Sequence, residues 1–166
     1  MAEELVWHGS VSQWKNFGFF VLQGLFAAAI VALFVWAWRS SSPEVRNLSP
    51  YILIFLAVPM FIAGKRYLQT KCTVYEVTTE RLKTTEGVFS KVTDTLEFYR
   101  VKDIERQQPF LYRLCGIENV LLNTSDASSP LVIIQAVRHD VDLADKIRNR
   151  VETIRQQKGV REIDVE

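Results

Sequence analysis

Long apolar stretches dominate the first part of the chain, and alternating polar and apolar positions dominate the rest. The first stretch, residues 17–38, holds 22 residues and no charged side chain. As an α-helix it would span roughly 33 Å, which exceeds a bilayer core of about 30 Å. A cleavable signal peptide fits poorly, because the apolar run is too long and two acidic residues, Glu3 and Glu4, precede it. We therefore predict a transmembrane helix over 17–38.

A second apolar stretch follows after a short polar loop, residues 39–47. Ser49 followed by Pro50 is typical of a helix start, a cap and then a fixed φ. We predict a second transmembrane helix over 48–68, kinked at Pro59. The two helices would form an antiparallel hairpin, with residues 1–16 as an interfacial segment that carries Trp7 and Trp14.

The distribution of Lys and Arg predicts the orientation of this hairpin. The loop 39–47 carries two arginines, whereas residues 65–83 carry five basic side chains. We therefore expect the loop to be external and both termini to be cytoplasmic.

The remaining residues, 69–166, have the pattern of a small domain of about six or seven short strands and one helix. Strand-like alternation is expected in the following segments: 71–78, 81–90, 92–99, 101–108, 118–126 and 130–137. Residues 110–116 are predicted to form a turn or brief helix. An amphipathic helix is predicted over about 140–158, with acidic residues in its first turns and basic residues in its last.

Charge and candidate chemistry exclude several functions. From residue 65 onward there are 17 Lys or Arg and 16 Asp or Glu, a balance that argues against a nucleic-acid binder. The two cysteines, Cys72 and Cys115, form no metal-binding spacing. The two histidines, His8 and His139, belong to no catalytic motif. We expect no enzyme activity, catalytic residue, metal or cofactor.

Several short motifs in the polar half occur in a familiar order. They are "YEVTTERL" (75–82), "EGVFS" (86–90), "YRVKDIERQQPFLYRLCGIENVLL" (99–122) and "LVIIQAV" (131–137), preceded by "WHGSVSQW" (7–14). This order resembles the bacterial pleckstrin-homology-like (PH-like) small membrane proteins. The resemblance implies an α+β fold, with a bent antiparallel β-barrel or sandwich capped by a C-terminal helix. It also implies a location in the bacterial cytoplasmic (inner) membrane, and it implies no settled activity.

Three sets of residues are candidates for function. The first, a partner or ligand surface, comprises Arg81, Asp103, Phe110, Leu111, Tyr112 and Arg113. Its charged members could form a structural Arg–Asp pair or recognise a partner or anion, and its apolar members could complete the core, dip into the bilayer or contact a partner. The second set, Lys65, Arg66 and Lys71, could attract anionic lipid or simply set the topology. The third, Gly24, Ala28 and Ala32, could pack within the hairpin or against another membrane helix.

Together these features predict a non-enzymatic, membrane-anchored scaffold or adaptor that binds or stabilises a membrane protein complex. Its partners would be the lipid bilayer and a membrane protein or a second copy of the chain. The alternative function is a lipid-headgroup or small-ligand binding module that senses the membrane. The phosphoinositide version of this alternative is weak, because the first hairpin loop, "TTER", is short and holds one arginine.

Overall fold

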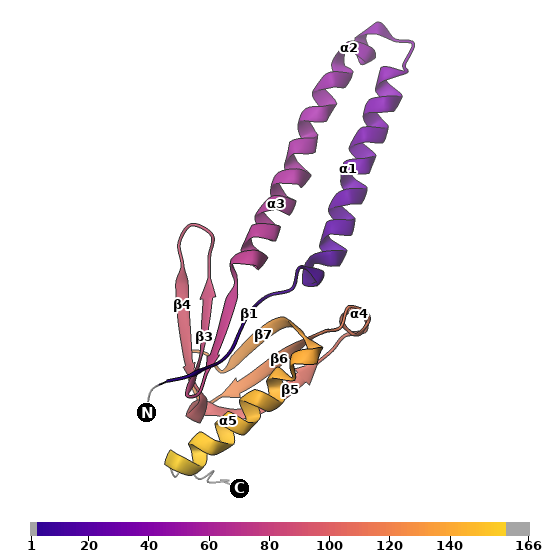
Figure 1. The fold of residues 1–166 in the computed structure, drawn as a ribbon. Helices are drawn as coiled ribbons and strands as arrows, with labels where there is room; N and C mark the ends of the chain where they lie inside the picture. The colour runs from indigo at the N-terminus through magenta and orange to yellow at the C-terminus, as the bar shows by residue number, and fades with distance from the viewer. Residues whose placement is uncertain (1–2, 159–166) are drawn as a thin grey trace. The chain divides into compact units, whose positions relative to one another are not determined.

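The computed structural model describes residues 3–158, and the chain divides into two compact units. One unit is formed by residues 16–68, and the other combines residues 1–15 with residues 69–166. The first is helical and the second holds two β-sheets (Figure 1).

The helical unit contains two long helical stretches. A short 3-10 helix, η1 (Gln13–Asn16), leads into α1 (Phe17–Trp38). The second stretch is built from α2 (Pro43–Ile52), the 3-10 segment η2 (Leu53–Leu56) and α3 (Ala57–Cys72). The 3-10 segment contains Phe55, whose carbonyl oxygen cannot accept a helical hydrogen bond from Pro59, because proline has no N–H.

The second helical stretch begins earlier than predicted. Ser42 has an extended backbone and Pro43 occupies the first helical turn, so Pro43 starts the helix and Pro50 lies inside it. Because Pro50 has no N–H, it cannot bond to the carbonyl oxygen of Arg46. The hydroxyl of Ser49 donates a hydrogen bond to that oxygen instead, at 2.7 Å. Ser49 and Pro50 therefore lie inside the helix, where the Ser49 hydroxyl replaces the hydrogen bond that Pro50 cannot donate, and they do not start the helix.

Two stripes of shielded residues identify the faces along which this hairpin packs. On α1 the stripe holds Gln23, Ala27, Ile30, Phe34 and Ala37. On the second stretch it holds Val45, Ser49, Ile52, Leu56, Pro59 and Ala63. The alternating spacing of three and four is that of a coiled-coil seam. Gly24, Ala28 and Ala32 are exposed and lie outside this stripe, so in the hairpin they are not packed against the second helical stretch.

The other unit contains seven strands in two antiparallel sheets among the described residues. The first sheet has the order β1 (Leu5–Ser10), β2 (Val74–Thr78), β3 (Arg81–Glu86) and β4 (Val92–Glu97). The second has the order β5 (Val101–Gln107), β6 (Ile117–Thr124) and β7 (Leu131–Arg138). The two sheets are separate, so the sandwich form of the predicted fold is correct and a closed barrel is not.

Strand β1 was not predicted. Residues 1–16 were expected to lie at the membrane interface, but Leu5–Ser10 pairs with β2, and Trp7 packs against the core. The partner strand lies more than sixty residues away along the chain. Local periodicity cannot detect this pairing, because only the strand opposite tells which face of β1 is buried.

One hydrophobic core joins the two sheets and the last helix. The short 3-10 helix η3 (Phe98–Arg100) connects the sheets, and its Phe98 is completely buried. A second 3-10 helix, η4 (His139–Val141), leads into α5 (Leu143–Lys158). The predicted apolar stripe of α5 is buried: Leu143, Ala144, Ile147, Val151 and Ile154. This helix therefore closes the core of the sandwich, as its amphipathic pattern predicted.

Candidate functional site

Arg81, the first predicted site residue, holds a turn together. Its Nε lies 2.8 Å from Oε1 of Glu3, and its backbone N–H donates to the hydroxyl of Thr78 at 3.1 Å. Thr78 also lies 2.7 Å from the same oxygen of Glu3. The hydrogen bond from Thr78, together with the positive charges of Arg81 and Lys83, lowers the pKa of Glu3. Arg81 therefore has a structural role, and its partner is an N-terminal carboxylate that the sequence analysis did not consider.

Tyr75 belongs to the same motif and links the two sheets. It lies on β2 with only 2% of its surface exposed. Its hydroxyl accepts a hydrogen bond from the backbone N–H of Gln135 on β7, at 3.3 Å. Burial raises the pKa of Tyr75, because the interior disfavours a phenolate. The motif "YEVTTERL" therefore has a structural role: Tyr75 links the two sheets, and Thr78 and Arg81 hold the turn together.

Asp103 and Arg113 were predicted as a possible structural pair, and the structure does not bring them together. Asp103 is exposed on β5 and accepts a hydrogen bond from the N–H of Ile104 at 2.7 Å. Arg113 is exposed on the brief helix α4 (Phe110–Leu114). In the part of the chain that the structure describes, neither side chain forms an ion pair.

The apolar residues of α4 divide between surface and core. Phe110 is 79% exposed and Leu111 is 55% exposed. Leu114, which was not among the predicted site residues, is 78% exposed. Tyr112 is only partly exposed and packs against the core. Three large apolar side chains therefore lie on the surface of one five-residue helix, more than a polar surface normally presents together.

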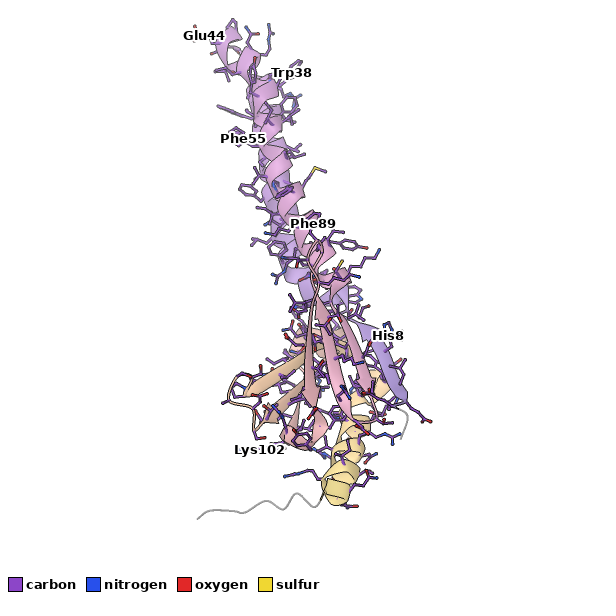
Figure 2. The ribbon with its side chains drawn as sticks, turned by 90° about the vertical axis from the view of Figure 1, so that its left-hand side faces the viewer. His8, Trp38, Glu44, Phe55, Phe89 and Lys102 are labelled. Atoms are coloured by element: carbon purple, nitrogen blue, oxygen red, sulfur yellow. The ribbon has the colours of Figure 1, made fainter. Side chains whose placement is uncertain are left out.

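A second exposed apolar residue, Phe89, lies at the tip of the β3–β4 hairpin and was not predicted. Its side chain is fully exposed, and Figure 2 labels its position. The turn depends on Gly87, whose φ is +120°, a value that other residues rarely adopt. A Cβ at Gly87 would lie 1.8 Å from the carbonyl oxygen of Ser90. Only glycine fits this turn, so the tip has a defined shape that presents Phe89 outward.

These two apolar tips lie at the same end of the β-sheet unit. In the first sheet, Ser10 is paired with Val74, Val74 with Thr85, and Thr85 with Thr93. The hairpin tip 87–91 therefore extends from the end of the sheet where β1 finishes and β2 begins (Figure 1).

The second sheet is joined to this same end. The helix α4 connects β5 to the start of β6, where Ile117 is paired with Arg138 on β7. Just before Arg138, the carbonyl of Ala136 accepts a hydrogen bond from the N–H of Ser12 at 3.1 Å. Lys15 also donates to the side-chain oxygen of Gln135. Both contacts come from the segment that follows β1, so α4 and the hairpin tip share one end.

The predicted basic residues are not gathered into one site. Lys65 and Lys71 are exposed. Arg66 is also exposed, and it makes contacts at the base of the helical hairpin, where its Nε donates to Oδ1 of the buried Asn16 at 3.2 Å. Its guanidinium also lies over the ring of Phe19, 5.6 Å from the ring centroid, a cation–π contact. Arg66 therefore contributes to hairpin packing as well as to the charge distribution.

The local sequence pattern does not predict the burial of the acidic side chain of Glu118. It lies on β6 with its side chain 2% exposed, and its Oε2 lies 2.7 Å from Nδ1 of His139. Its Oε1 has no hydrogen-bond partner among the described residues. The strand alternation breaks here, because the β6–β7 register shifts between Glu118 and Val120 and buries two successive residues. A plain period-two pattern could not reveal this.

Potential metal ligands and thiols are dispersed among the described residues. Among the described residues no group of three or more His, Cys, Asp or Glu side chains could hold a metal ion. Cys72 and Cys115 are free thiols, and Cys115 packs partly against the core. The features that stand out are instead exposed apolar surface and internal ion pairs.

A comparison with known protein families agrees with this fold. Residues 17–157 match the family model described as the bacterial PH domain. Among solved structures, the Vps36 N-terminal PH domain is similar at 17% identity and a TM-score of 0.39, covering 52% of this chain and 67% of that chain. No curated protein matches the sequence. PH domains are typically non-catalytic modules that mediate protein or lipid interactions. Because the family model spans most of the chain, including strands β2 to β7 and nearly all of the closing helix, the chain belongs to the bacterial PH domain family.

Proposed function

We propose that this protein is a non-enzymatic adaptor, anchored in the bacterial cytoplasmic membrane by its helical hairpin. The observation that carries the anchoring is the surface of the two helical stretches, Gln13–Trp38 and Pro43–Cys72. Within the most apolar window of each, only 6% and 11% of the residues are buried. A core helix of a water-soluble protein would bury far more of such a surface. The lengths of 26 and 30 residues would reach roughly 39 and 45 Å, more than a bilayer core requires.

The proposed topology places the β-sheet unit in the cytoplasm. The basic residues that follow the second helical stretch outnumber those of the inter-helix loop, and such an excess favours the cytoplasmic side. A reporter fused after Glu166 should be active only where cytoplasmic reporters are active. A reporter inserted at Ser41 should behave as external. An external signal from the Glu166 fusion would contradict this topology.

The pairing of cations supports an adaptor over a lipid-headgroup sensor. A phosphate site needs several donors that converge on one point. Here Arg81 is paired with Glu3, and Arg100 with Asp126 at 2.8 Å. A third arginine, Arg106, is paired with acidic residues at the start of α5. These three guanidinium groups are engaged within the domain and do not converge on one point, so a protein surface is the better candidate for recognition.

The edge strand β4 offers such a surface. It is the last strand of the first sheet, and its residues 92–95 are exposed. An unpaired strand edge can accept a strand from a partner, with backbone hydrogen bonds providing affinity. Anchoring would keep this edge near membrane proteins and replace a diffusive encounter with a local one.

Site-specific photocrosslinking in cells tests this proposal. A photoreactive residue at Asp94, on β4, should form an adduct with a membrane protein. The same residue at Glu152, exposed on α5, should not. Solubilisation in mild detergent should recover the partner in a fixed ratio. A chain that yields bound lipid but no protein adduct at Asp94 would favour the lipid-sensing alternative.

A further inference from the structure

We propose that the two apolar tips of the β-sheet unit form a second, shallow membrane contact. The tips are the β3–β4 turn with Phe89 and the helix α4 with Phe110, Leu111 and Leu114, and we call them together the apolar end. Its occupant is the headgroup–acyl boundary of a lipid bilayer. This inference rests on the proposed anchoring. It adds that the β-sheet unit itself contacts the membrane surface and is not attached to the membrane through the helical hairpin alone.

Both connections of the chain to the proposed membrane helices start from the apolar end. The chain leaves the β-sheet unit after Ser10 to reach α1, and it returns from α3 into β2 at Val74. These two residues are paired partners in the first sheet. Both covalent connections to the proposed membrane helices therefore lie at the end of the unit that also holds the apolar tips (Figure 1).

The composition of the tips suits a lipid interface. Residues 87–91, "GVFSK", contain one cation and no acidic residue, and so do residues 110–114, "FLYRL". Aromatic and aliphatic side chains beside Lys or Arg are typical of segments that bury an apolar face just below anionic headgroups. Phe89 is fully exposed on its turn, and Phe110 and Leu114 are each more than three quarters exposed.

Two separated tips fit a bilayer better than a single protein partner. One tip extends from the first sheet and the other from the second sheet. A broad fluid surface can accept both tips without matching the shape of the surface between them. At the other end of the unit, the exposed Lys102 of β5 provides a reference position far from the tips (Figure 2).

Depth-dependent fluorescence quenching of the full-length chain tests this contact. The protein, with Cys72→Ser and Cys115→Ser, is reconstituted into vesicles of phosphatidylethanolamine and phosphatidylglycerol. An environment-sensitive dye is attached at one position at a time, through Ser90→Cys, Leu114→Cys or Lys102→Cys. Added phosphatidylcholine carries a nitroxide near the carbonyl end of its acyl chain. We expect several-fold stronger quenching at Ser90 and Leu114 than at Lys102.

Two controls make the outcome decisive. A dye at Phe26→Cys, on an exposed position of α1, reports whether the hairpin itself is inserted. Adding Phe89→Ser to the Ser90 label should reduce lipid quenching and leave the thermal midpoint unchanged, because this side chain is fully exposed.

Each other result overturns the proposal in a recognisable way. Quenching at Phe26 but not at the tips, with the tip dyes open to aqueous iodide, leaves the anchor intact and removes the membrane contact. Tip dyes shielded from both the nitroxide and iodide would show that protein, such as a second copy, covers the apolar end. Absence of quenching at Phe26 would remove the anchoring and this inference with it.

Discussion

The pair formed by the buried Glu118 and the half-exposed His139 yields the sharpest prediction about stability. Glu118 has one carboxylate oxygen on His139 Nδ1 at 2.7 Å and the other without a partner among the described residues. Replacing His139 with Ala would leave a nearly inaccessible carboxylate with no side-chain partner. A hydrogen bond to a charged group contributes about 1.5–3 kcal/mol. Because His139 is half exposed, solvent replaces part of that contribution, and we expect a loss of about 1–2 kcal/mol.

The reverse substitution should behave differently. Glu118→Leu removes the buried polar group together with its desolvation penalty, and the volume is similar. Replacing a buried ionic group with a well-packed apolar one is often neutral, so we expect a change within about 1 kcal/mol. In the Glu118→Leu background, His139→Ala should then have almost no further effect. The predicted coupling between the two substitutions is therefore at least about 1 kcal/mol.

Thermal unfolding of the full-length protein in detergent, followed by near-ultraviolet circular dichroism, measures this coupling. In a domain of this size about 1 kcal/mol corresponds to roughly 4–8 °C in the midpoint. Arg138→Ala is the matched control, because its pair with Asp140 is mostly exposed and should contribute no more than about 1 kcal/mol. Equal midpoints for His139→Ala and the unmodified protein would refute the reasoning, as would strictly additive effects.

Three further predictions follow from single positions. Ala37→Leu should loosen the helical hairpin and lower its thermal midpoint, because Ala37 is only 2% exposed. Ala28→Leu should leave the midpoint unchanged, because Ala28 is exposed, and equal effects of the two substitutions would contradict the assigned packing. Gly87→Ala should destabilise the β3–β4 turn by about 1–3 kcal/mol, seen as faster amide exchange at the tip, and unchanged exchange would disprove the strain argument. The hydrogen bond from the Thr78 hydroxyl lowers the pKa of Glu3. The ionised Glu3 therefore stabilises the fold above its unfolded-state pKa, and this stabilisation is lost as pH falls through its folded-state pKa. Glu3→Gln should therefore lower the midpoint at neutral pH and flatten its decline in acid, and identical pH profiles would count against the role of this carboxylate.

Local sequence patterns determined the elements that need no distant partner. The helix of 17–38 could be placed because its length and lack of charge suffice to specify it. The approximate positions of the strands after residue 73 and of the closing helix could also be predicted, since alternation and helical periodicity are properties of neighbouring residues. The ordered motifs led to the family, which the match over residues 17–157 confirmed.

The tertiary structure alone decided features that depend on residues far apart in the chain. Residues Leu5–Ser10 form the strand β1 by pairing with β2. This pairing also brings Glu3 to the turn, where it becomes the partner of Arg81. Asp103 and Arg113, ten residues apart, were plausible partners on sequence grounds, but strand and helix geometry separate them.

Exposure was the other property that only the structure could decide. Phe89 and Glu118 have side chains whose type predicts the opposite of their actual surroundings, an aromatic ring on the surface and a carboxylate inside. A glycine turn directs the first outward, and a register shift in β6 directs the second inward. The type of a side chain indicates how favourable its exposure to water is, whereas the backbone path determines whether the side chain points toward solvent or into the core.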